Sequence, residues 1–465
     1  MSPLSDPDFG QMLGRVVDPP PGTRSREMAA TLGRFEMPTS NTLGMGDVPI
    51  FWEQARGANV ADPDGNVYVD LTAASCVAAA GHSNPEIVAA ISEQASKLMH
   101  TQGALHPAVP RVELLEKLAE VAPGELSVSH IVNTGAEAVE TAYKTARIYT
   151  KQPGFIAFEG GFHGKLGGAL TLTSKNYYRQ DFLPLLPEVH HYPYAYCYRC
   201  PYGREYPACD IFCAKYIEQR LDSPDSGLPR MAGLIFEPVI GHGGWIVPPI
   251  EFAQELRRFT QERGILLVAD EIITGFGRTG KWFACQHSDI VPDVLVVAKS
   301  MASGFPISAV ITTPEIAAAW GSCQHTSTFL GNPLGCAAAL ASISYIERHN
   351  LVQRSAEIGE RMLDALEEMF ARYAIIGDVR GRGSMVGFEI VTDRKSKEPG
   401  PGLARQIRDA CYQRGVIASN VGGMYGNVLK LSPPLVITDQ QIDFAMEAMD
   451  ESISLAQRSF SNRVN

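Results

Sequence analysis

The sequence predicts an α/β protein, with a large domain built on a mostly parallel, helix-covered sheet and a smaller α+β domain at the C-terminal end. From His106 onward, strand-like apolar runs alternate with amphipathic helical stretches, which is the pattern of parallel strands joined by helices. After about Leu334 this alternation gives way to a long helical stretch. A chain of 465 residues is long enough for two or three domains.

Residues 1–70 are predicted to form an N-terminal arm and a hairpin. The first 48 residues or so are rich in Pro, Gly, Ser and Asp, and a short helix is expected near residues 24–32. The sequence DPDGN at residues 62–66 is a strong turn signal between two β-prone runs, so a hairpin is expected there. Beyond it, Pro85 is expected to open a helix that Ser83 or Asn84 can cap.

Residues 71–335 are predicted to form the large domain. Two of its apolar runs, residues 265–269 and 294–298, each end in a charged residue, Asp270 and Lys299. Such runs are typical of buried parallel strands, and ligands bind at the carboxyl edge of sheets of this kind. Two ordinary strand ends, with the lysine stem on apolar surface and its ammonium group in water, would give the same pattern.

Residues 336–465 are predicted to form the small α+β domain. Its first element is a long helical stretch that bends near Asn350. Two strands and two helices follow, and the strands are expected in GDVRGRGSMVGFEIV and NVLKLSPPLVI.

Composition excludes several classes of partner. The formal net charge of −11 gives no support to a nucleic-acid or anionic-membrane partner. No uninterrupted apolar run reaches the roughly 18 residues of a membrane-spanning helix. The N-terminal residues lack the basic and then apolar pattern of a signal peptide, and the nine cysteines are expected to be reduced. We therefore expect a cytoplasmic protein.

Two glycine-containing turns after predicted strands are candidates for cofactor binding. In SHIVNTGAEAVE, Thr134 and Glu137 have capping-box spacing, and Gly135 lets a ligand approach the first free N–H groups of a helix. In GGFHGK, residues 160–165, Phe162 could stack on a planar cofactor. A well-capped helix and a glycine-rich turn with one buried ring are the structural alternatives.

Seven motifs stand in a fixed order between about residues 50 and 440: NTGAEAVE, GGFHGK, FEPVIGHGG, DEIITGFGRTGKWFA, PDVLVVAKSMASGFP, STFLGNPLGCAAA and DVRGRGSMVGFEI. With this set of motifs the chain resembles the class III (ω-amino-acid type) aminotransferases. The resemblance implies the aspartate-aminotransferase-like fold (fold type I) of enzymes that use pyridoxal 5'-phosphate (PLP), and a homodimer with shared active sites. It also implies transfer of an amino group between a primary amine (an ω-amine, amino acid or aminosugar) and a keto acid or aldehyde.

The resemblance gives the two catalytic residues their roles. Lys299 is expected to form a Schiff base with the cofactor's aldehyde and later to carry a proton, which requires a partly deprotonated amine. Asp270 is expected to pair with the pyridine nitrogen and keep it protonated. Since both residues are present, a non-catalytic relative is the less favoured interpretation.

The resemblance also implies the residues that hold the cofactor. Phe162 is expected to stack on its ring beside His163, and Glu237 to support the site near Asp270. The expected phosphate ligands are the N–H groups of Gly135 and Ala136 and the hydroxyl of Thr328 from the neighbouring subunit.

The substrate side departs from the family pattern. In members that use γ-aminobutyrate or ornithine, a glutamate of a GEGG turn pairs with an arginine on a late strand, but here the two positions are His242 and Lys430. Lysine lacks the planar fork with which arginine binds a carboxylate. Lys165 replaces an expected arginine, Ile273 stands where a glutamine is common, and Trp52 is a further substrate-side candidate.

His242 also motivates an alternative function, a PLP-dependent racemase or epimerase. Such enzymes need a second acid/base opposite the lysine, and the unperturbed pKa of histidine suits proton transfer. A His242 that shapes the pocket or binds a substrate hydroxyl is the favoured interpretation.

Four cysteines lie close together in the sequence, with the spacing C-x2-C-x8-C-x3-C. They could bind zinc or an iron–sulfur cluster. A packed loop with reduced thiols fits the surrounding Tyr and Pro residues equally well, and we predict no metal. The four are Cys197, Cys200, Cys209 and Cys213.

Overall fold

The computed structural model describes residues 6–40, 42–43, 48–418 and 421–464, in two compact units. The first unit combines Met1–Asn84, Ile358–Val379 and Val386–Asn465, and the second combines Pro85–Glu357 with Arg380–Met385. The domain boundaries predicted from the sequence stay predictions.

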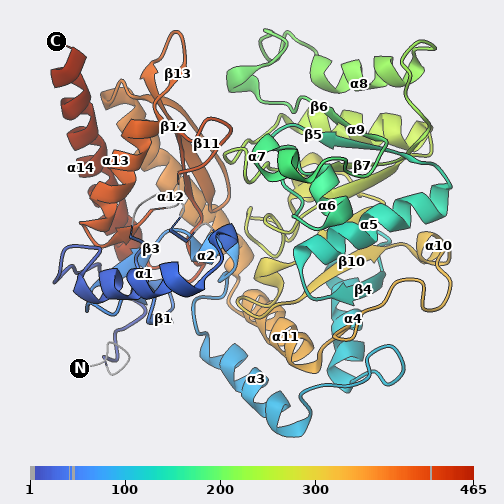
Figure 1. Ribbon diagram of the computed structural model, residues 1–465, viewed down its shortest axis with the longest axis horizontal. Coiled ribbons are helices and arrows are strands. Elements are labelled where there is room, and N and C mark those ends of the chain that lie inside the picture. Colours follow the sequence, from blue (N-terminus) through green and yellow to red (C-terminus); the bar gives the residue numbers. More distant parts are fainter. Residues whose placement is uncertain (1–5, 41, 44–47, 419–420, 465) are drawn as a thin grey trace. The chain divides into compact units, whose positions relative to one another are not determined.

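The second unit is built on a seven-stranded sheet in the order β4-β10-β9-β8-β7-β5-β6 (Figure 1). Strand β10 runs antiparallel to β4 and β9, while the pairs from β9 across to β6 are parallel. The mostly parallel sheet predicted from the sequence is therefore confirmed. Its strands are β4 (Val128–Val132), β5 (Gly154–Phe158), β6 (Val189–Tyr192), β7 (Met231–Phe236), β8 (Leu266–Asp270), β9 (Val294–Val297) and β10 (Ser308–Thr312).

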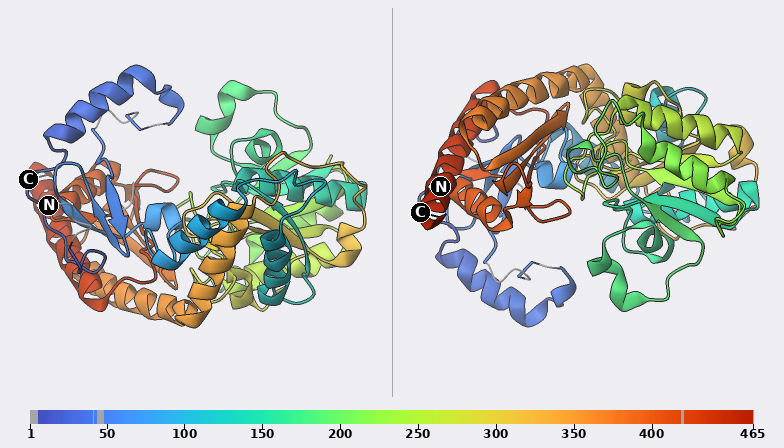
Figure 2. Two further views of the ribbon diagram at one scale, coloured as in Figure 1. Left: turned by 90° about the horizontal axis from the view of Figure 1, so that it is seen from below. Right: turned by 90° about the horizontal axis from the view of Figure 1, so that it is seen from above.

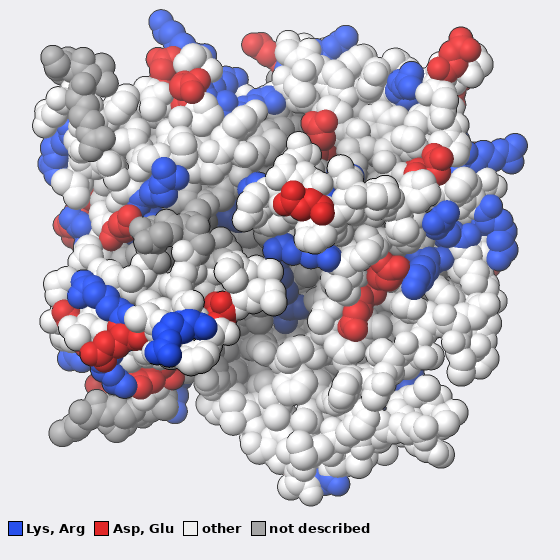
Figure 3. All heavy atoms as spheres, viewed as in Figure 1, with Lys and Arg blue, Asp and Glu red and all other residues white. Residues whose placement is uncertain are grey.

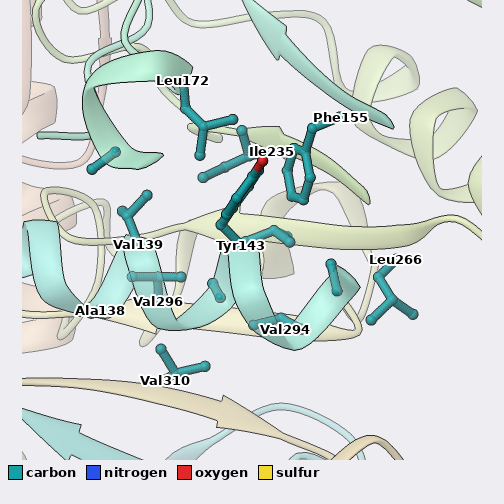
Figure 4. Packing of buried hydrophobic residues seen from close by; sticks show 14 of the residues in the cluster. Ala138, Val139, Tyr143, Phe155, Leu172, Ile235, Leu266, Val294, Val296 and Val310 are labelled. Carbon is teal, nitrogen blue, oxygen red and sulfur yellow. The ribbon is translucent and has the colours of Figure 1, made fainter. Parts of the chain in front are cut away.

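The core of the second unit lies between helix α5 (Gly135–Thr150) and the sheet (Figure 4). Val139 and Tyr143 of α5 pack with Phe155 of β5, Ile235 of β7 and Val296 of β9. The central strands are buried along their whole length, as is typical of parallel strands covered on both faces. The other helices are α3 (Pro85–Lys97), α4 (Val109–Val121), α6 (Gly167–Leu172), α7 (Asn176–Arg179), α8 (Phe212–Asp222), α9 (Ile250–Glu262), α10 (Pro314–Ala317) and α11 (Pro333–Arg348).

Two helix boundaries follow the sequence signals. Helix α3 begins at Pro85, as predicted. The bend expected near Asn350 is a complete break between α11 and α12 (Leu351–Arg372), because Asn350 has a positive φ of 50°. Asparagine tolerates this left-handed conformation better than most residues.

The first unit joins the two ends of the chain. Strand β14 (Val416–Ile417) pairs in parallel with β3 (Val67–Asp70), and Figure 2 shows the blue N-terminal strands among the orange and red C-terminal elements. Strands β2 (Asn59–Ala61) and β3 form the hairpin predicted around DPDGN. The remaining elements are β1 (Gln54–Arg56), α1 (Thr23–Phe35), β11 (Ile376–Arg382), β12 (Met385–Asp393), β13 (Glu398–Pro399), α13 (Pro401–Tyr412), β15 (Val428–Leu431) and α14 (Asp439–Val464).

One short element, α2 (Ala73–Cys76), is a left-handed turn that the sequence did not predict. All four of its residues have φ between 46° and 66°. Each such residue costs roughly 1–2 kcal/mol when it is not glycine. The preceding segment is anchored by Asp70, whose carboxylate accepts from the N–H and hydroxyl of Thr72 and pairs with His82 at 2.8 Å.

The surface carries both signs of charge. On the face in Figure 3, Lys and Arg side chains are interspersed with Asp and Glu. Among the described helices, none is long and apolar enough to cross a membrane.

Candidate active site

The first part of the site is the turn between β4 and α5. The predicted capping box is present, because the Thr134 hydroxyl accepts from the Glu137 N–H and the Glu137 carboxylate accepts from the N–H groups of Asn133 and Thr134. Within the described part of the chain, the N–H groups of Gly135 and Ala136 donate no hydrogen bond. Two open N–H groups at the start of a 16-residue helix fit a phosphate group.

The second part is the turn of residues 160–165, which follows β5 and packs on the first turn. Gly164 has a φ of +121°, and a Cβ added there would lie 2.6 Å from the Cβ of Ala136. The position therefore needs glycine for both its backbone conformation and its close packing. This packing sets the turn that carries Phe162 and His163 beside the turn between β4 and α5.

A buried acid–imidazole pair lies at the end of β8. Nδ1 of His163 donates to Oδ2 of Asp270 at 2.7 Å, while Oδ1 of Asp270 accepts from the N–H of Ile272 at 3.1 Å. Burial works to lower the pKa of His163, but the hydrogen bond and charge of Asp270, together with the charge of Glu237, raise it above its ordinary value. The raised pKa favours the imidazolium form of His163 beside the Asp270 side chain.

Glu237, the first residue after β7, joins two turns. Its Oε1 accepts from the N–H of Phe162 at 2.9 Å, and its Oε2 accepts from the N–H of Gly241 at 2.8 Å. The Tyr194 hydroxyl donates to the main-chain carbonyl of Glu237 at 2.8 Å. Burial raises the pKa of Glu237, and the charge of Asp270 adds to this rise against the opposing effect of His163.

Lys299 follows β9, the strand that pairs with β8. Asp270 lies opposite Val296 in the parallel register, so both charged residues belong to the same edge of the sheet. Lys299 is half-buried and has a left-handed φ of 42°. The turn after it is held by the Ser342 hydroxyl, which donates to the Ser300 carbonyl at 3.1 Å. Backbone strain of this kind is concentrated at functional sites.

Among the residues predicted to face the substrate, His242 stacks on Phe162. The two ring centroids are 3.9 Å apart and the rings are 19° from parallel. Tyr178 meets Phe162 edge-on at 5.6 Å, and Nζ of Lys165 lies 4.4 Å from the centre of the Tyr178 ring. A Cβ at Gly241 would lie 2.6 Å from Cδ1 of Ile273, so that side chain packs against the turn that carries His242.

Three further residues were predicted for the site: Thr328, Trp52 and Lys430. Thr328 lies on an exposed stretch of loop, next to Ser327, whose hydroxyl is 3.5 Å from the Asn133 side-chain amide. Trp52 and Lys430 belong to the first unit. There, Trp52 meets His82 edge-on at 5.5 Å, and Lys430 lies on β15 opposite Gly387 of β12.

Three of the four clustered cysteines lie in the segment between β6 and α8, and the fourth lies in α8. Cys197 begins a short 3-10 turn, and Cys213 is the second residue of α8. None of the four forms a disulfide bond with another described residue. Among the described residues, no group of three or more His, Cys, Asp and Glu side chains is arranged to hold a metal ion.

Sequence reasoning missed two residues that contact the site. Tyr178 stands in the segment KNYYR, which has no pattern of a functional motif. Arg380 was part of the recognised motif DVRGRG but had no role there, whereas its Nε donates to the Gly244 carbonyl at 3.0 Å. The Arg380 contact links positions 136 residues apart, and such a contact leaves no local signal.

Comparison with known proteins identifies one family. The sequence model described as aminotransferase class-III matches residues 42–453. The chain is 38% identical over 403 residues to a probable 4-aminobutyrate aminotransferase of Bacillus subtilis, covering 86% of this chain and 92% of that protein. It is 36% identical over 406 residues to a leucine/methionine racemase of Thermococcus litoralis, covering 87% of this chain and 91% of that protein.

Solved structures agree with this match. An amine transaminase from an uncultivated Pseudomonas species, in its PLP-bound form, superposes with a TM-score of 0.84 at 29% identity. The alignment covers 91% of this chain and 99% of that one. The fold predicted from the sequence is thereby confirmed.

Proposed function

The chain belongs to the class III aminotransferases, which are PLP-dependent enzymes, and from this membership we propose that Lys299 and Asp270 are its catalytic residues. The main support is the buried hydrogen bond between His163 and Asp270, which is 2.7 Å long. Asp270 ends β8, and Lys299 follows β9, the strand that pairs with β8. An aspartate side chain held in place by a hydrogen bond from an imidazole suits a partner that must keep a proton on a ring nitrogen.

Each cofactor-binding residue has a task that its geometry supports. When bound, PLP supplies an electron sink for the carbanion that forms at the substrate's Cα. The N–H groups of Gly135 and Ala136 would hold its phosphate, and Phe162 would stack on its ring. Asp270 would hold the proton on the pyridine nitrogen. The Lys299 amine would bind the aldehyde carbon and, once displaced by substrate, would move the proton at Cα.

The substrate side is proposed to accept a primary amine from one partner and return it to a keto acid or aldehyde. Lys165, exposed beside Tyr178, supplies a positive charge for a substrate carboxylate. His242 and Ile273 line the turn in which other members carry the glutamate of their switch. Trp52 and Lys430 are further proposed substrate contacts.

The test is a half-reaction. Candidate amines are added to the holoenzyme without any keto acid, and the absorbance of the bound cofactor is followed. Conversion to the amine form of the cofactor, at a rate that depends on the amine, is the expected result. A Lys299→Ala protein that still turned over an amine would disprove the proposal.

A racemase or epimerase is the second candidate, favoured by the position of His242 on Phe162. A second acid/base on the face opposite the lysine would return the proton to Cα from the other side. In that case the cofactor absorbance would stay unchanged while deuterium from solvent enters Cα of a single amino acid. Absence of that exchange would exclude this candidate.

A homodimer is also proposed, supported by an exposed apolar surface around Thr328. Phe329 is 56% exposed and packs on His100 at 5.0 Å, while Met99 and Leu105 are each 63% exposed. Apolar side chains grouped in this way are typical of subunit interfaces. Sedimentation of wild type and Phe329→Glu should give a dimer and a monomer. A monomeric wild type would contradict the proposal.

A cytoplasmic location is proposed as well. It is supported by the nine cysteines, none of which forms a disulfide bond with another described residue.

A further inference from the structure

We propose that Arg380 is a positioning residue that, together with Glu237, holds the turn of residues 241–245 at its two ends and so fixes His242 on Phe162. This inference deepens the proposed function and rests on it, because the turn carries the residue that we place on the substrate side. It assigns the shape of the substrate pocket to a residue from a distant part of the sequence.

The first anchor is at the start of the turn. Oε2 of Glu237 accepts from the Gly241 N–H at 2.8 Å, and its other oxygen accepts from the N–H of Phe162 at 2.9 Å. One buried carboxylate therefore sets the spacing between the backbone of the stacking ring and the backbone that leads into His242.

The second anchor is at the end of the turn. Nε and Nη2 of Arg380 donate to the Gly244 carbonyl at 3.0 and 2.7 Å, and Nε also lies 3.2 Å from the Trp245 carbonyl. The guanidinium carbon lies 5.2 Å from the centre of the Tyr196 ring, so the group is held over an aromatic ring as it donates. A lysine could not reproduce this fork.

The turn needs these anchors because its own backbone is strained. Trp245 has a left-handed φ of 48°, which is unfavourable for a bulky residue, and Gly244 has a φ of 112°. Such conformations persist where surrounding contacts impose them. A two-way bridge between Ile240 and Ile246, at 3.0 and 3.1 Å, closes the base of the turn.

His242 lies between the two anchors. It follows Gly241 directly and precedes Gly244 by two residues, and the result is the 3.9 Å stack of its ring on Phe162. Loss of the Arg380 contacts would release the Gly244 and Trp245 carbonyls from this anchor, while the Ile240–Ile246 bridge would still close the base of the turn. His242 would then leave Phe162, and the substrate-facing wall would move while the phosphate-binding turn and the His163–Asp270 pair stay in place.

The direct test observes His242 in protein labelled with 13C-histidine, without added cofactor. Its resonance is assigned by its loss in His242→Gln, and the stacked Phe162 ring shifts it away from the position of an exposed imidazole. Arg380→Met is expected to abolish this shift, and Arg380→Lys to reduce it. The matched control is Arg394→Met, since Arg394 also donates to main-chain carbonyls, those of Ile376 and Tyr373 at 2.7 Å.

Kinetics of the holoenzyme give the second measurement. Arg380→Met is expected to lower kcat/KM for the amine by about 100-fold, the scale on which a misplacement of about 1 Å acts. Cofactor affinity and the absorbance of the bound cofactor should match the wild type, and Arg394→Met should retain wild-type kinetics. The inference is overturned if the His242 resonance does not move in Arg380→Met, or if the Arg380 and Arg394 variants lose kcat/KM equally.

The proposed function and the positioning role of Arg380 can be disproved separately. If Lys299→Ala is active, the proposed function fails, whatever the His242 resonance does. If Lys299→Ala is inactive but Arg380→Met leaves both the resonance and kcat/KM unchanged, only the positioning role fails.

Discussion

The cofactor side and the substrate side of this site are built in different ways. On the cofactor side, Asp270 ends β8, Lys299 follows β9, and the side chain of Asp270 contacts His163 directly at 2.7 Å. On the substrate side, the anchors bind main-chain groups of the turn, the N–H of Gly241 and the carbonyl of Gly244. Backbone anchors leave the side chain at position 242 free to differ without loss of the turn. This arrangement suits a family that keeps one cofactor and changes its substrates.

The largest expected effect comes from Asp270→Asn, a substitution that disrupts the cofactor side alone. Asp270→Asn keeps the shape of the side chain but removes the charge that would hold a proton on the ring nitrogen. The single-turnover rate with an amine should fall by about 10³-fold, the scale for loss of one preorganised electrostatic partner. Stopped-flow absorbance measures this rate. Asp293→Asn is the matched control, because Asp293 binds the Leu267 N–H at 2.7 Å and Arg257 at 2.9 Å outside the site. A rate within 10-fold of wild type would contradict the assignment.

The next prediction concerns the pH dependence of stability on the cofactor side. The pKa of His163 is raised in the folded state. Below the unfolded value of about 6.5, both states hold the proton and the stabilisation is fully present. As pH rises from there through the folded pKa, only the folded state holds the proton. The free energy of unfolding should therefore fall, by up to about 1.4 kcal/mol per pH unit.

Chemical unfolding of the apoenzyme between about pH 6.5 and 9 measures this slope, and His163→Asn should be flatter than wild type by that amount. His191→Asn is the matched control. Burial lowers the pKa of His191 to about 4, so its own titration lies below this range and the wild-type slope should remain. Equal slopes in wild type and His163→Asn would show that the His163–Asp270 pair holds no extra proton.

The cofactor side was easier to predict from the sequence than the substrate side. Strand ends such as Asp270 and Lys299 are recognisable because an apolar run that stops at a charge is a local pattern, and the capping box of Thr134 and Glu137 is local as well. The Phe162–His242 stack and the Arg380 anchor join segments 80 and 136 residues apart, so only the folded chain reveals them. The strain at Lys299 was equally invisible, since φ depends on packing around the residue.

A smaller effect should separate substrates by charge. Lys165→Ala removes the exposed ammonium group beside Tyr178, so KM should rise about fivefold for amines that carry a carboxylate, in keeping with a surface ion pair of about 1 kcal/mol. Amines without a carboxylate should show an unchanged KM. Steady-state kinetics with one substrate of each kind measure the difference. Lys175→Ala is the control, since Nζ of Lys175 lies farther from the same ring, at 5.9 Å. Equal changes for both substrates would remove Lys165 from carboxylate binding.

The smallest expected effect concerns backbone strain in the first unit, which can be compared with the strained turn in the second unit. In the left-handed turn α2, Ala74 has a φ of 51° and a ψ of 51°, and Asp70 anchors the segment before it. Ala74→Gly removes the Cβ penalty but adds freedom to the unfolded chain, so stability should rise by only about 0.5–1 kcal/mol. The free energy of unfolding from urea titration measures it, and Ala410→Gly inside α13 should destabilise by about the same amount. A loss of stability in Ala74→Gly would mean that its methyl group contributes more by packing than the strained backbone costs.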